Sequence, residues 1–104
     1  MLDHALEAVA MAKGKTRADL DEDRQLNLSL VRLLEIIGEA ATRIPKEDQT
    51  RYTDISWLEI VSLRNRLIHG YDTVDFDILW QIVKQDLPWL IESLKIILGE
   101  ESQG

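Results

Sequence analysis

Apolar residues recur at intervals of three and four along most of the chain, which is the spacing of amphipathic α-helices. This pattern predicts a first helix over residues 2–13, followed by Gly14 in a C-terminal capping position. A second helical region is expected from Thr16 to about Arg43, with the acidic stretch 19–23 as a candidate break. The first half of the chain is therefore predicted to be entirely helical.

The second half shows the same periodicity in two further segments. Ser56 has the spacing of a capping box that opens a third helix, which is expected to run about 14 residues and to end at Gly70. Asp75 is the expected N-cap of a last helical region over residues 76–98, where Pro88 must kink the helix or mark a restart capped by the preceding Asp86. No alternating strand pattern is present.

The chain has 104 residues, of which 45% are hydrophobic, enough for one core without metal or disulfide staples. Cysteine is absent, which excludes disulfides and thiolate metal sites and fits a cytoplasmic location. The sequence has neither a membrane-length apolar run nor a signal peptide at its start. We therefore expect an all-α antiparallel bundle of four to five helices that forms a single domain over residues 1–104.

The second helical region has a broader apolar stripe than one packing partner needs. Leu26, Val31 and Ile36 widen the stripe beyond the residues at three- and four-residue spacing. Such a surface suggests two neighbours, one of which is a candidate second subunit.

The third predicted helix carries a charged residue in the middle of its apolar face. Arg64 lies seven residues after Trp57, so the two share a face. A guanidinium group cannot lose its proton and is costly to bury alone. The residues allow two interpretations: a buried ion pair with Glu35 or Glu39, or a cleft in which Arg64 meets a substrate phosphate.

His69 lies five residues after Arg64, near the expected end of the same helix. In an ideal helix these two side chains point about 140° apart, and His69 shares a face with Asn65 instead. Either the last turn unwinds at Gly70, or a second copy of the motif completes the site in a two-fold dimer. By itself His69 is more simply a histidine favoured by the helix dipole, and Asn65 could equally orient the imidazole or cap polar groups.

The net charge of −7 argues against bulk electrostatic attraction to a nucleic acid. Any RNA contact must therefore be local, and Arg64 and Arg66 concentrate positive charge at the candidate site. Arg66 is either a solvated surface residue or a phosphate contact. Tyr71 is expected in a turn near this site and partly exposed, as an ordinary surface tyrosine would also be.

The pattern Arg64-Asn65-x-x-x-His69-x-Tyr71 resembles the R-N-x-x-x-H-x-Y signature of the HepT toxins, within the HEPN superfamily. The similarity extends over most of the chain and includes three blocks, residues 34–40, 57–72 and 79–88.

This resemblance implies a dimeric ribonuclease that needs no metal or other cofactor. By matching position, His69 would be the general acid–base residue and Arg64 would stabilise the phosphate charge, with Asn65 and Arg66 in support. RNA would be the substrate, with tRNA as a candidate. A partner is also implied, an MntA-like nucleotidyltransferase antitoxin that adds AMP to Tyr71 and forms a larger complex with the homodimer.

Two rivals to the ribonuclease remain open at this point. One is a non-catalytic subunit that presents substrate or nucleotide to a minimal nucleotidyltransferase, which the acidic balance favours somewhat. The other is a structural helical dimerisation module.

Overall fold

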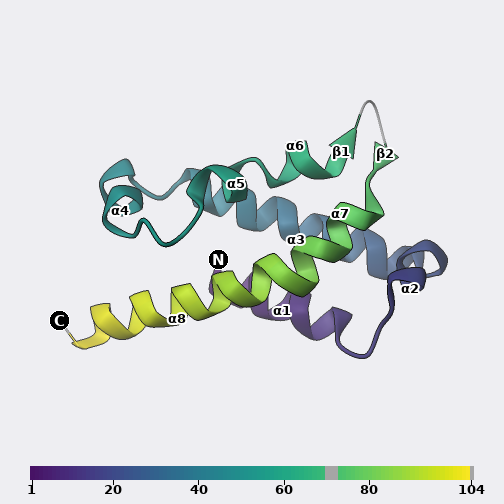
Figure 1. The fold of residues 1–104 in the computed structure, drawn as a ribbon, viewed down its shortest axis with the longest axis horizontal. Coiled ribbons are helices and arrows are strands. Elements are labelled where there is room, and N and C mark those ends of the chain that lie inside the picture. The colour runs from purple at the N-terminus through teal and green to yellow at the C-terminus, as the bar shows by residue number, and fades with distance from the viewer. Residues whose placement is uncertain (70–72, 104) are drawn as a thin grey trace.

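The computed structural model describes the backbone of residues 1–69 and 73–103, and the side chains of these residues except His69 and residues 100–103. The described chain is mostly helical, with one short two-stranded hairpin, in agreement with the all-α fold class predicted from the sequence (Figure 1). Its elements are α1 (Leu2–Ala12), α2 (Arg17–Glu22), α3 (Arg24–Thr42), α4 (Lys46–Arg51), α5 (Trp57–Val61), α6 (Leu63–Leu67), β1 (Ile68–His69), β2 (Thr73–Val74), α7 (Phe76–Gln81), the π-helical turn η1 (Ile82–Asp86) and α8 (Leu87–Gln103).

The first half follows the sequence expectation closely. Gly14 follows α1 with φ +78°, a left-handed conformation that glycine adopts without steric cost. The expected break in the second helical region falls at Asp23, whose Oδ1 accepts a 3.0 Å hydrogen bond from the amide of Leu26 at the start of α3. Asp23 is therefore both the C-cap of α2 and the N-cap of α3, the longest helix of the described chain.

The core is organised around α3, which packs against α1 and α2 and, in the other direction, against α5 and α6 (Figure 1). The α8 helix in turn packs on α1, and α7 contacts α2 and α6. The molecule is thin, with principal extents of 46 × 30 × 17 Å. The fully buried large side chains come from several helices: Leu20, Leu30, Leu34, Ile37, Leu67, Leu79, Ile82, Val83 and Leu87. No helix in the described ranges is both long enough and apolar enough to span a membrane.

Pro88 is accommodated differently from either sequence expectation. The segment from α7 to α8 stays helical, and η1 inserts a wider turn just before the proline, in which the amide of Leu87 donates to the carbonyl of Ile82. A wider turn relieves the clash that a proline ring makes with the preceding helical turn. Asp86 does not cap a new helix, because its carboxylate binds Arg66 instead.

Candidate active site

The predicted third helix is interrupted in its middle. Ser62 separates α5 from α6 with φ −94° and ψ +14°, and its hydroxyl donates a 2.6 Å hydrogen bond to the carbonyl of Leu58. A serine that bonds back to the preceding turn offers the backbone an alternative to regular helix and bends it. The prediction of one continuous helix was therefore wrong.

The helix also ends earlier than predicted, at Leu67 instead of Gly70. Ile68 is extended, and β1 pairs antiparallel with β2 so that Ile68 lies opposite Val74 and His69 opposite Thr73. β-Branched residues at three of these four positions favour strand over helix. The helix therefore unwinds before His69, as one of the two alternatives from the sequence required. The separation of about 140° between Arg64 and His69, which assumes one continuous helix, does not apply here.

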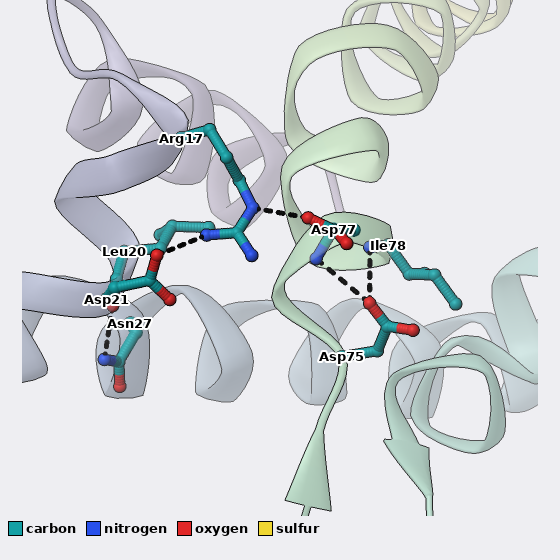
Figure 2. A network of polar contacts seen from close by, with 7 residues as sticks. All are labelled: Arg17, Leu20, Asp21, Asn27, Asp75, Asp77 and Ile78. Atoms are coloured by element: carbon teal, nitrogen blue, oxygen red, sulfur yellow. Dashed lines mark hydrogen bonds and ion pairs between the residues drawn. The ribbon is translucent and has the colours of Figure 1, made fainter.

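The return arm of this hairpin is fixed to the helical core by a polar network (Figure 2). The carboxylate of Asp75 caps α7 by accepting hydrogen bonds from the amides of Asp77 and Ile78 at 3.0 and 3.1 Å. Arg17 in α2 binds Asp77 at 2.8 Å and Asp21 at 3.1 Å. The hydrogen bond that Arg17 donates to Asp77, followed by its hydrogen bond to Asp21 and the charges of both carboxylates, raises the pKa of Arg17 above its ordinary value. The first turn of α7, which follows β2, is therefore joined to α2.

Arg64 is exposed, which corrects the expectation that it lies in the buried apolar face. The buried positions of α5 and α6 are Ile60, Leu63 and Leu67, at spacings of three and four. This stripe contains no charged residue. Arg64 lies outside it, because the buried position in this turn is taken by Leu63. An apolar stripe without a charge was thus available in the sequence and is the one the fold uses.

Arg64 lines a small cavity of about 170 Å³ between α3 and α6, bordered by Arg32, Glu35, Gly38, Glu39, Thr42 and Val61. Within residues 1–69 and 73–103, Arg64 forms no ion pair with Glu35 or Glu39, and Glu35 is bound by Arg32 at 3.4 Å. The buried ion pair is therefore not formed. The alternative interpretation, an arginine at an open cleft, agrees with this position.

The two residues that follow Arg64 behave differently. Asn65 is exposed, and no capping role is seen for it in the described part of the chain, while the imidazole of His69 that it was expected to orient lies outside the described side chains. Arg66 is not simply a solvated surface residue, because its Nη2 binds Oδ2 of Asp86 at 3.1 Å. This pairing joins α6 to η1 across 20 residues of sequence, and no local spacing could have indicated it.

The predicted modification site, Tyr71, lies outside the described residues, as does Gly70. The structure places the backbone of His69 directly after α6, so it brings Arg64 and His69 onto consecutive elements. Among the described residues no group of three or more His, Asp or Glu side chains could hold a metal ion.

Comparison with known proteins yields one family and several relatives. A family model described as "Ribonuclease HepT-like" matches residues 1–97. A protein of Caldanaerobacter subterraneus subsp. tengcongensis named "Putative RNase" is 36% identical over 96% of this chain and 93% of its own length. A "Probable ribonuclease HepT" of Thermococcus cleftensis is 37% identical over 86% of this chain and 84% of its own.

A third relative is a larger protein of Methanocaldococcus jannaschii whose name reads "Gamma-glutamylcyclotransferase and putative RNase". It is 36% identical over 95% of this chain, which spans only 46% of that relative. No solved structure matches the chain.

Proposed function

Because the chain belongs to the HepT-like ribonuclease family, we propose that it is a ribonuclease that cleaves RNA without a metal ion. The observation that carries this proposal is the exposed Arg64 at an open cavity, on the helix directly before the strand that contains His69. A permanently charged, accessible guanidinium and a histidine five residues later in the sequence have the composition of a site for phosphodiester cleavage.

The chemistry divides between the two side chains. His69 removes the proton from a ribose 2′-OH, the 2′-oxygen forms a bond to the adjacent phosphorus, and the bond from phosphorus to the 5′-oxygen breaks. The 5′-oxygen leaves with a proton returned by a histidine. Arg64 stabilises the negative charge that builds on the phosphorane oxygens. Asn65 and Arg66 support the site, Arg66 through its ion pair with Asp86.

We further propose that the enzyme works as a homodimer with the cleft at the two-fold axis. The cavity at Arg64 carries both signs of charge, with Arg32 and Arg64 beside Glu35 and Glu39. A surface with both signs is self-complementary when a two-fold axis brings two copies together. Leu58, 81% exposed on neighbouring α5, supplies apolar area to the same contact.

The biological role proposed is that of a toxin held in check by an MntA-like nucleotidyltransferase. That partner would transfer AMP to Tyr71, two residues after His69, and form a larger complex with the dimer. A phosphate group on Tyr71 would place negative charge beside the cationic site and compete with RNA there. The proposed substrate is RNA, with tRNA as the leading candidate.

The test is cleavage of total cellular RNA by wild-type protein and His69→Ala, each with and without EDTA. We expect wild-type protein to give discrete fragments that EDTA does not abolish, and His69→Ala to give none while keeping its helical circular dichroism. Strict dependence on a divalent metal would overturn the mechanism. Absence of cleavage, together with stimulation of a nucleotidyltransferase partner, would instead identify a non-catalytic nucleotide-presenting subunit, which the net charge of −7 would suit.

A further inference from the structure

A second cavity lies on the opposite side of α6 from Arg64 and has the features of a ligand pocket. Its volume is about 370 Å³, within the range of about 300–1,000 Å³ typical of small-molecule sites. The floor is apolar and the rim polar, and the lining residues come from α5, α6, η1 and α8: Ser56, Glu59, Ile60, Leu63, Arg66, Ile82, Gln85, Asp86, Leu87, Trp89 and Leu90.

Trp89 gives this pocket an aromatic wall. The side chain is 49% exposed, although tryptophan is the largest of the apolar residues and is usually well covered. An accessible indole beside an apolar floor is a platform on which a planar heterocycle can stack, which is how many proteins hold unpaired nucleobases.

The polar rim selects the kind of heterocycle. Asp86 binds Arg66 through Oδ2, and within the described chain its Oδ1 accepts no hydrogen bond. Together with Glu59 it makes the rim rich in acceptors, and Arg66 offsets only one of these two charges. A neutral base whose edge carries an exocyclic amino group can donate to these carboxylates, whereas a phosphate would be repelled.

The pocket also has a suitable place relative to the proposed reaction. Arg66 at its edge and Arg64 at the other cavity belong to the same five-residue helix. An α-helix with its side chains is only about 10 Å across, so a single RNA strand can cross α6 and touch both sides.

We propose that this pocket, with Trp89 and Asp86 as its key residues, binds an amino-bearing nucleobase next to the cleaved phosphate. Guanine, adenine and cytosine fit this description, and uracil does not, because it lacks the amino group. The inference rests on the proposed ribonuclease function, to which it adds a preference for sequence around the cleavage site.

The first measurement is a titration of the protein with neutral nucleosides, followed by the indole N–H signal of Trp89 in NMR spectra. Loss of one signal in Trp89→Phe assigns it among the three tryptophans. We expect this signal to report binding of guanosine, adenosine or cytidine at least about fivefold tighter than binding of uridine. Asp86→Ala, which removes an acceptor, should reduce this difference. No shift with any nucleoside, or equal binding of all four, would overturn the proposal.

The second measurement is cleavage of short RNAs. We expect Trp89→Ala to raise KM at least about fivefold with little change in kcat, Trp89→Phe to restore most of the loss, and Ile96→Ala to match wild-type protein. Ile96 lies on the same helix, is 62% exposed and is outside the pocket, so it is a matched control.

The two measurements separate the two proposals. The base pocket would be rejected if Trp89→Ala cleaved RNA normally and nucleosides did not shift the Trp89 signal of wild-type protein. The ribonuclease proposal would then stand. Wild-type protein that cleaves no RNA would reject the ribonuclease, and the nucleoside titration would still decide the pocket. A change in oligomeric state in Trp89→Ala, without nucleoside binding in wild-type protein, would show that the pocket is a protein contact.

Discussion

The backbone amide of Asp75 donates a 2.8 Å hydrogen bond to the carbonyl of Leu67. Leu67 is the last residue of α6 and Asp75 is the N-cap of α7, so this bond joins the two helices at the base of the hairpin that contains His69. The segment that would act on substrate is thus held at both ends by rigid elements. Loops positioned in this way by a scaffold are common sites of catalysis.

Asp75→Ala is expected to lower the free energy of unfolding by about 1 kcal/mol, the usual cost of a lost N-cap. The variant keeps the backbone amide that binds Leu67 but loses the two hydrogen bonds that the carboxylate accepts. Thermal denaturation should show a melting temperature roughly 4–8 °C lower for a domain of this size.

Asp77→Ala is the matched control, since Asp77 is in the same first turn. Its ion pair with Arg17 is solvent-exposed, with the Asp77 side chain 84% accessible, and should contribute less than about 1 kcal/mol. An equal loss of stability in both variants would show that the cap has no special role.

Helix existence and type were largely predictable from the sequence, because α1, α3 and α8 carry long periodic stripes and the starts of α3 and α7 carry recognisable capping residues. The predicted break near Asp23 and the N-cap at Asp75 are both confirmed. These features depend on residues three or four positions apart, which is the range over which helix periodicity and capping operate.

The site was less predictable, because its shape depends on contacts between distant residues. The strand at Ile68 and His69 exists because Thr73 and Val74 return to pair with it, and Arg66 is oriented by Asp86. Arg64 was assigned to the wrong face because the break at Ser62 lies inside a stretch with strong helical periodicity. The burial of the residues in this segment therefore follows from tertiary packing, which residue spacing alone does not show.

The close approach of α3 to α5 gives a prediction for Gly38. A Cβ atom added there would lie 3.1 Å from the carbonyl oxygen of Ile60, so a larger residue must push α5 away. We expect Gly38→Val to destabilise the protein by about 1–3 kcal/mol in chemical denaturation. Gly38→Ala should gain little or nothing, because the contact offsets its better helix propensity of about 1 kcal/mol.

Gly99→Ala provides the comparison for this effect. Gly99 lies in α8 and nothing stands within 4 Å of its Cβ position, so alanine should stabilise the helix by up to about 1 kcal/mol. If Gly38→Ala stabilised the protein as much as Gly99→Ala, the tight contact between α3 and α5 would be contradicted.

Substitutions of Arg64 and Arg66 should separate effects on the reaction rate from effects on protein stability. Arg64 is exposed and unpaired in the described chain, so Arg64→Ala should leave the melting temperature unchanged and lower kcat about 10²–10³-fold, as expected for a lost charge stabiliser. Arg64→Lys should restore only part of the rate, because a lysine cannot bind phosphate oxygens in bidentate fashion.

Arg66→Ala should instead lower stability more than Arg64→Ala and lower kcat less. Its ion pair with Asp86 is about one-third exposed, so its loss should cost up to about 1 kcal/mol of stability. The fall in kcat should be smaller than for Arg64→Ala. If Arg66→Ala lowered kcat more than Arg64→Ala, then Arg66 and not Arg64 would be the residue that stabilises the phosphate charge.

Mixing two inactive variants tests whether the site is shared between two chains. If Arg64 of one copy works with His69 of the other, a dimer of one Arg64→Ala chain and one His69→Ala chain contains one intact pair. Random exchange makes about half of the dimers mixed, each with one of two sites working, so activity should return to about a quarter of the wild-type value. Refolding the variants together, followed by an RNA cleavage assay, measures this directly. Each variant refolded alone is the control and should remain inactive. A mixture as inactive as its components, with mixed dimers verified by a tag on one chain, would place Arg64 and His69 of a working site in the same chain.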